Sequence, residues 1–116
     1  MNTWPVAASL LERALKHQNT HTIEDVKAAI DEGKAQLWCG LKSALVTEIV
    51  VYPLGKTCRI WLAAGDMNEL TRDMLPAVEG WAKHKGCNAV QIIGRHGWKR
   101  VLTDYHQPHT VLVREL

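Results

Sequence analysis

Residues 81–102 read WAKHKGCNAVQIIGRHGWKRVL and contain, in order, a helix end, a strand, a tight turn and a second helix. Gly86 is the expected end of the first helix, because glycine tolerates the left-handed backbone with which helices often finish. The run Ala89–Ile93 predicts a strand. Two glycines then bound the turn Gly94–Gly97, and a short helix is expected over Trp98–Tyr105.

The rest of the chain predicts the elements around this stretch. Apolar residues at helical spacing, with a capping box at Thr22–Asp25, predict two opening helices. Runs rich in β-formers then predict three strands in an antiparallel meander, after which Asp66 or Asn68 caps a long helix. Pro76 lies inside that helix, so a kink or a start nearer Leu75 is expected. The expected ranges are 4–17, 23–32, 35–40, 44–52, 58–63, 66–85, 89–93, 98–105 and a terminal strand at 110–116.

This element order, ααβββαβαβ, predicts an α/β sandwich with a mixed, mostly antiparallel sheet flanked by helices. A chain of 116 residues suffices for one domain, residues 1–116, because two independent cores are hard to build at this length. The net charge of +2 is too small to indicate a nucleic-acid partner by itself.

The cysteines and the apolar runs bound the class further. The three cysteines form no CxxC pair, so we expect no zinc site and no other metal. No apolar run is long enough to span a bilayer, so no membrane association is expected. Because no signal peptide is visible at Met1–Pro5, the sequence favours a cytoplasmic protein without disulfides.

A family resemblance covers nearly the whole chain. The helix end WAKHKGC at 81–87, followed by strand, polar turn, short helix and last strand, resembles the C-terminal half of GNAT acetyltransferases, where a WAxxxGC helix end precedes the same elements. The two opening helices and the meander match the first half of that fold, apart from its first strand. Residues 93–102, IGRHGWKRVL, are similar to a GRxGWxRVL segment of small GNAT-like proteins encoded by phages and prophages. The resemblance implies a GNAT-like sandwich.

The resemblance also implies acetyl-CoA as the cofactor. GNAT enzymes hold its pyrophosphate on backbone N–H groups at the start of the long helix, through an R/Q-x-x-G-x-G/A loop. The matching stretch here is AAGDMNELTR at 63–72, which has one glycine. Asp66 and Glu69 stand where the phosphates would approach, and their charge opposes an anion; helix capping is their other reading. The cofactor-binding residues that the resemblance implies are Leu62, Ala63, Ala64, Gly65 and Arg72.

A base and an acid are implied in the same way. The family's base is typically a Glu on the central strands, or a water held there, and Glu48 is the available carboxylate. Its strand is otherwise apolar, so partial burial of this carboxylate is expected; a solvent-facing strand residue is the alternative. The family's acid is a Tyr in the last short helix. In the alignment with the family, the position of that Tyr falls near Val101 and Leu102. Tyr105 can therefore be the acid only if the alignment shifts by three or four residues.

Residues 94–100, GRHGWKR, gather basic groups between glycines, an arrangement suited to an anion. The preceding IIGRHG stretch also resembles the IIGxxG core of KH RNA-binding domains, whose GxxG loop clamps a nucleotide backbone. That loop joins two helices in a KH domain, whereas here it follows a strand. A strand-to-helix turn with solvated basic residues is the structural alternative. The candidate anion- or nucleic-acid-binding residues are Gly94, Arg95, Gly97, Lys99 and Arg100.

Three functions therefore stand at this point. The first is acetyl-CoA-dependent N-acetylation of a small-molecule or protein amine. The second is a non-catalytic phage or prophage assembly or binding component on the GNAT fold, which the degraded phosphate loop favours. The third is nucleic-acid binding through 94–100, for which the small net charge gives little support.

Overall fold

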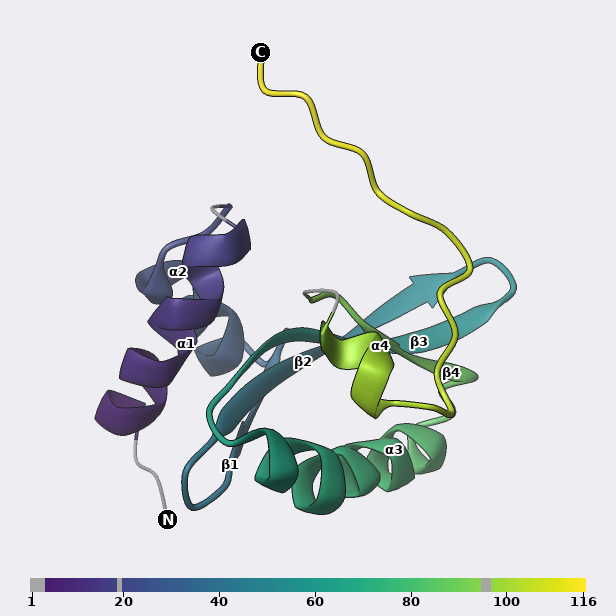
Figure 1. Ribbon diagram of the computed structural model, residues 1–116, viewed down its shortest axis with the longest axis horizontal. Helices are drawn as coiled ribbons and strands as arrows, with labels where there is room; N and C mark the ends of the chain where they lie inside the picture. Colours follow the sequence, from purple (N-terminus) through teal and green to yellow (C-terminus); the bar gives the residue numbers. More distant parts are fainter. Residues whose placement is uncertain (1–3, 19, 95–96) are drawn as a thin grey trace.

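The computed structural model describes residues 4–18, 20–94 and 97–116. Two helices are followed by three strands, a helix in two parts, a fourth strand and a short helix (Figure 1). Their bounds are α1 Trp4–Gln18, α2 Ile23–Asp31, β1 Gln36–Cys39, β2 Ala44–Tyr52, β3 Gly55–Ala64, η1 Glu69–Met74, α3 Leu75–His84, β4 Ala89–Ile92 and α4 Gly97–Val101. The predicted α/β class and the order of the first eight predicted elements are confirmed, with small shifts at the ends and the long helix divided into η1 and α3.

The four strands form one open, mixed sheet in the order β1-β2-β3-β4. β1, β2 and β3 are antiparallel neighbours, as the predicted meander requires, and β4 runs parallel to β3. The two-residue turn Pro53-Leu54 pairs Tyr52 with Gly55 and so fixes the β2–β3 register.

Helices cover both faces of the sheet (Figure 1). α1 and α2 pack on one face, and η1, α3 and α4 pack on the other, so that each face has its own core cluster. The first cluster includes Leu11, Leu15, Val26, Val46 and Leu62, and the second includes Leu45, Ile60, Leu70, Val78 and Ala82. Alternation along β2 explains the division, because Leu45 and Val46 point to opposite faces.

The local start and stop signals act as expected. Thr22 and Asp25 form the predicted capping box at the start of α2. Asp66 accepts a hydrogen bond from the backbone N–H of Glu69 at 2.9 Å, which confirms it as a helix cap. The helix then runs as a π-helical segment until α3 begins at Leu75, with Pro76 in its first turn, where the sequence predicts a start.

The predicted terminal strand at 110–116 is wrong. Residues 106–116 have no regular secondary structure and are exposed, and Figure 1 shows this segment (yellow) leaving the sheet and ending far from it. A strand needs a neighbour to complete its ladder of hydrogen bonds, and this segment meets none among the described residues. The described sheet therefore has four strands, and not the five that the sequence predicts.

Among the described residues, no helix combines the length and apolar character that crossing a membrane requires.

Candidate functional site

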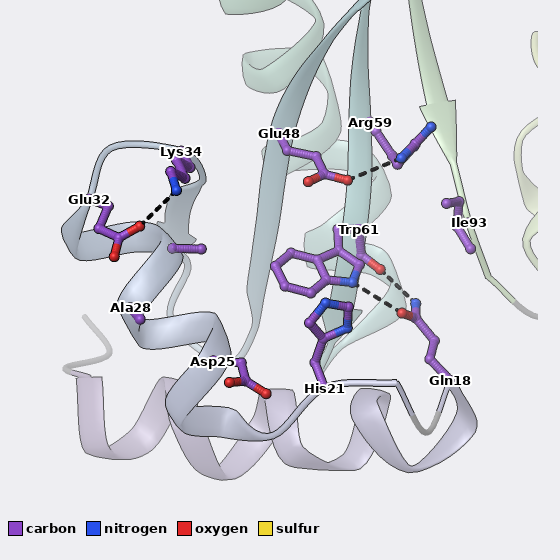
Figure 2. Close-up of a pocket in the computed structure, with 11 residues that line it drawn as sticks. Gln18, His21, Asp25, Ala28, Glu32, Lys34, Glu48, Arg59, Trp61 and Ile93 are labelled. Atoms are coloured by element: carbon purple, nitrogen blue, oxygen red, sulfur yellow. Dashed lines mark hydrogen bonds and ion pairs between the residues drawn. The ribbon is translucent and has the colours of Figure 1, made fainter.

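A cleft of about 560 Å³ lies between the sheet and the α1–α2 pair (Figure 2). Its walls come from the end of α1, the face of α2, the loop after α2, and the middle of the sheet. The side chains that give it chemistry are Gln18, His21, Asp25, Glu32, Lys34, Glu48, Arg59 and Trp61. Glu32 pairs with Lys34 at 3.1 Å and the Asp25 carboxylate accepts from the Thr22 N–H in the capping box, so Glu48 is the cleft carboxylate that comes from the sheet.

Glu48 is held by Arg59 on the neighbouring strand. The two residues are directly opposite in the β2–β3 ladder, and Arg59 NH1 lies 3.2 Å from Glu48 Oε1. The Glu48 side chain is 32% exposed, and no residue in the described ranges donates a hydrogen bond to its other oxygen, Oε2. Arg59 also donates from Nε to Gln91 on β4 and from NH2 to the Tyr52 hydroxyl, both at 3.1 Å. The carboxylate is therefore fixed in direction, with one oxygen toward the cleft.

The second wall is built on Trp61. Its indole Nε1 donates to Gln18 Oε1 at 3.1 Å, and the Gln18 amide donates to the Trp61 carbonyl at 2.8 Å. The His21 ring packs edge-on against the indole at 4.8 Å between centroids. These contacts attach the end of α1 to the middle of β3 (Figure 2). They also give the cleft an aromatic side beside the Glu48 carboxylate.

Trp61 marks a bulge in β3. The β2 partners pass from Val46, opposite Leu62, directly to Thr47, opposite Ile60, so Trp61 has no partner. A bulge bends a strand and increases its local twist. β4 follows β3 only to Ile60, and the last bond between them, from Ile93 N–H to the Ile60 carbonyl, is 3.3 Å long.

The residues implied for the cofactor lie just past that point, where β3 has no β4 neighbour. The Leu62 side chain is buried in the α1–α2 core, so only its backbone is available to a ligand. Ala63 and Ala64 are half-buried, and Gly65 is exposed. Gly65 has a φ of +125°, and a Cβ there would come within 2.5 Å of the Lys42 carbonyl. The turn therefore requires glycine for its own geometry.

The acids after Gly65 are used by the fold itself. Glu69 accepts hydrogen bonds from the backbone N–H groups of Leu41 at 2.7 Å and Lys42 at 2.9 Å, in the β1–β2 turn. Bonding from the Ser43 side chain and from these backbone groups lowers the pKa of Glu69. Ser43 also accepts a hydrogen bond from the backbone N–H of Asp66 at 2.9 Å. The helix start is thus tied to the β1–β2 turn by the Glu69 carboxylate and by the bonds between Ser43 and the Asp66 backbone.

Arg72, the remaining cofactor candidate, is exposed one turn into the helix. It lines a shallow second cavity of about 400 Å³. The other charged residues of that cavity are Lys42, Asp66, Glu69 and Asp73. Three carboxylates against two cations make this a poor place for a pyrophosphate.

Tyr105 lies on the opposite face of the sheet from Glu48. It packs with the α3–α4 core cluster, and its hydroxyl donates to Glu79 on α3 at 2.6 Å. Burial, together with the bond to Glu79 and that residue's charge, raises the pKa of Tyr105. The structure therefore does not bring the two residues implied as base and acid together.

The basic segment 94–100 joins β4 to α4, which is not the helix-to-helix connection of a KH domain. A Cβ on Gly94 would lie 2.6 Å from the Trp98 ring, so this glycine lets the indole pack closely against its backbone. Gly97 begins α4, and Arg100 is exposed. Arg95 and the Lys99 side chain lie outside the described residues. Within the described residues, no group of three or more His, Cys, Asp or Glu side chains gathers as metal ligands would.

Sequence reasoning missed Arg59, Gln18 and Trp61. The signal for Arg59 was present: a two-residue turn after Tyr52 places Arg59 opposite Glu48, four steps away on each strand. No local signal identifies the Gln18–Trp61 pair, whose members are separated by 43 residues.

Solved structures resemble this fold along its length. A tetramutant of the BH1408 protein from Bacillus halodurans superposes with a TM-score of 0.73 at 16% identity, covering 97% of this chain and 94% of that one. A probable acetyltransferase gives 0.70 at 7% identity, covering 94% and 89%. An aminoglycoside acetyltransferase from an uncultured soil metagenomic sample, solved with sisomicin, gives 0.69 at 12% identity, covering 97% and 88%.

No protein-family model matches the sequence, and no curated protein matches it. The likeness is one of fold: the chain has the GNAT-like acetyltransferase fold, as the sequence predicts, with a four-stranded open sheet flanked by helices.

Proposed function

We propose that this protein is an acyl-CoA-dependent N-acetyltransferase that acts on a small-molecule amine. The observation that carries the proposal is the position of the Glu48 carboxylate in a cleft that also contains Trp61, at the level where β3 separates from β4. Two structural neighbours are named as acetyltransferases, one of them for aminoglycosides, and they support this reaction class and a small substrate.

The chemistry assigned to the cleft is proton removal from the amine. When bound, acyl-CoA would supply a thioester carbonyl to the amine nitrogen, and the C–S bond would break as the C–N bond forms, so that CoA leaves as a thiolate that takes up a proton. Glu48 takes the amine proton on Oε2, directly or through one water, while Arg59 holds Oε1 and so aims the free oxygen. Trp61 lines the cleft beside this carboxylate and is only 8% exposed, so it serves as an apolar wall.

The residues of this chain suit the pantetheine part of acyl-CoA better than its pyrophosphate part. Backbone groups at Leu62 and Ala63, just past the end of the β3–β4 pairing, suit polarisation of the thioester carbonyl, and those at Ala64 and Gly65 suit the pantetheine arm. The pyrophosphate end meets the carboxylates of Asp66 and Glu69, with Arg72 as the nearby cation. Weak binding of the nucleotide part is therefore expected. Tyr105 engages Glu79 on the other face, so the proposal rests on Glu48.

Calorimetric titration with acetyl-CoA and with CoA tests this proposal. We expect binding that tightens in Glu69→Gln, where a negative charge is removed, and weakens in Arg72→Ala, where a cation is removed. An acetyl-transfer assay on a panel of amines, aminoglycosides among them, follows. Absence of heat for both ligands, in wild type and in Glu69→Gln, would reject the enzyme.

A second candidate is a binding protein on the same fold that has lost CoA chemistry, of which a phage or prophage assembly component is one form. The observation that favours it lies at the start of the long helix, where the Glu69 N–H already donates to the Asp66 carboxylate and the Asp66 N–H to the Ser43 hydroxyl. This candidate requires that acetyl-CoA and CoA fail to bind, so the same titration separates the two. We expect the protein to act in the cytoplasm under either candidate function.

A further inference from the structure

Acidic residues are unevenly distributed along this chain. Segments 49–65 and 80–103 contain seven lysines and arginines and no Asp or Glu, whereas all twelve acids of the protein lie elsewhere. The first segment includes the β2–β3 turn and all of β3, and the second begins in α3 and includes β4, the strand beside β3. Neighbouring elements of the fold therefore carry an excess of positive charge that the net charge of +2 conceals.

Three of these cations lie around the end of α3. Lys83 is exposed in its last turn, Lys85 directly follows it, and Lys56 on β3 donates from Nζ to the Lys85 carbonyl at 3.1 Å. The acid that precedes them on the helix, Glu79, accepts a hydrogen bond from Tyr105. None of the three lysines forms an ion pair with a carboxylate of the described ranges. Their charges are therefore available to an anionic partner.

An apolar hairpin tip lies beside these lysines. Leu54, in the β2–β3 turn, is 100% exposed, and Val51 is 74% exposed. Val51 is directly opposite Lys56 in the β2–β3 ladder, so the two side chains lie on the same face of the hairpin. Figure 1 shows this hairpin (teal) projecting past the end of α3. Exposed apolar residues bordered by charged ones are typical of a surface that binds a protein or a membrane.

We propose that this hairpin surface, formed by Val51, Leu54, Lys56, Lys83 and Lys85, binds the anionic face of a lipid bilayer. The lysines are attracted to the negatively charged lipid headgroups, and insertion of the tip removes the Val51 and Leu54 side chains from water. A nucleic acid attracts the same lysines, but its phosphate backbone offers these two apolar side chains no apolar surroundings. The combination of charge and apolar exposure therefore favours a bilayer.

Such binding is peripheral and needs no helix that spans the membrane. It also does not depend on the proposed acyl transfer, because the hairpin surface shares no residue with the Glu48 cleft. The cytoplasmic leaflet carries anionic lipids, so it is the bilayer face that we expect the hairpin surface to meet.

Co-sedimentation with lipid vesicles tests the proposal. Vesicles of equal parts phosphatidylglycerol and phosphatidylcholine should bind the protein at low salt, and pure phosphatidylcholine vesicles should bind it at least tenfold more weakly. Leu54→Ser should weaken binding to the anionic vesicles by about tenfold, because the inserted side chain is lost. The double substitution Lys56→Gln with Lys85→Gln should weaken it by about thirtyfold and reduce its dependence on salt.

Leu41→Ser and Lys16→Gln are the matched controls. Leu41 is 75% exposed in the β1–β2 turn, at the opposite end of β2 from the hairpin tip. Lys16 is exposed on α1, which packs on the other face of the sheet from α3. Both controls should bind the anionic vesicles as the wild type does. All of these variants should keep the wild-type circular dichroism spectrum, because each changed side chain is exposed.

NMR spectroscopy provides a second measurement, which needs no variant. In bicelles of the same lipids that include a gadolinium-chelating lipid, the backbone amide signals of residues 51–56 should broaden before those of α1. Three results would each overturn the proposal: no binding to anionic vesicles at low salt, equal losses of binding in Leu54→Ser and Leu41→Ser, or binding to duplex DNA or RNA in place of the vesicles.

Discussion

The Glu48 carboxylate and the Arg59 guanidinium face each other across β2 and β3, 3.2 Å apart, on the floor of the α1–α2 cleft. Arg59 also donates to Gln91, so one cation links β2, β3 and β4 at the level where the last two strands begin to separate. Charge-assisted hydrogen bonds of this kind hold a carboxylate in one orientation. The pair therefore fixes the direction of the group proposed as the base.

Glu48→Gln should lower kcat/KM for acetyl transfer by about 10²–10⁴, the usual effect of losing a general base. The glutamine oxygen can still accept from Arg59, so the fold is expected to persist. Steady-state kinetics on an accepted amine measures the effect, with Glu12→Gln, an exposed change on α1, as the control. Equal rates for Glu48→Gln and Glu12→Gln would show that Glu48 is not the base.

Gln18→Ala should reduce the free energy of unfolding by about 1–3 kcal/mol, because two hydrogen bonds to Trp61 disappear and partly buried groups lose their partner. Urea unfolding followed by Trp fluorescence measures this. Gln107→Ala is the control, since the Gln107 side chain makes one long, exposed bond to Thr110 at 3.3 Å. A loss no greater than that of the control would mean that the Gln18 contact does not secure α1.

Two glycines should respond to alanine with opposite signs. Gly65→Ala should destabilise the protein by about 2 kcal/mol or more, because φ is +125° and the new Cβ meets Lys42 and Ser43 at 2.5 Å. Gly80→Ala, inside α3 with nothing within 4 Å, should stabilise it by about 0.5–1 kcal/mol. Thermal unfolding compares them. Gly65→Ala at wild-type stability would contradict the close approach of these segments.

Glu69 should make stability depend on acid pH. Its pKa is held below the ordinary 4.5 by the Ser43 and backbone hydrogen bonds, so its contribution is present above about pH 4.5 and lost as pH falls through the folded-state pKa. Glu69→Gln should therefore show a shallower loss of stability on acidification. Urea unfolding at several acid pH values measures how steeply the free energy of unfolding falls with pH. Glu115→Gln, in the exposed segment 106–116, is the control. Parallel slopes for wild type and Glu69→Gln would contradict the prediction.

Tyr105 and Cys58 should make the stability of the protein depend on pH in the alkaline range. Burial raises the pKa of Cys58 from 9.0 to about 11, and burial with the Glu79 bond raises that of Tyr105 above its ordinary 10.0. Both groups therefore stabilise the fold while protonated, and this contribution is lost as pH rises above about 9. Tyr105→Phe should flatten the part of the loss that lies above about pH 10. An unchanged alkaline profile would show that Tyr105 is not held as described.

Short-range signals in the sequence were enough to predict the individual helices and strands of the sheet. The Thr22–Asp25 capping box, the β2 run, the Asp66 cap and the entry of Pro76 into α3 all act within a few residues, through backbone hydrogen bonding and periodicity. Because these signals are short-range, they survive without knowledge of the rest of the chain. They also carried the resemblance that led to the correct fold.

Which residues meet in the cleft, and whether residues 106–116 form a strand, depend on the tertiary structure. The Trp61 bulge, the Gln18 bond to it and the insertion of Glu69 into the β1–β2 turn join residues far apart in sequence. Such contacts depend on how whole layers pack, which no local pattern encodes. The same reason explains the missing fifth strand: 110–116 has the composition of a strand, but a strand forms only by pairing, and this segment pairs with none of the described strands.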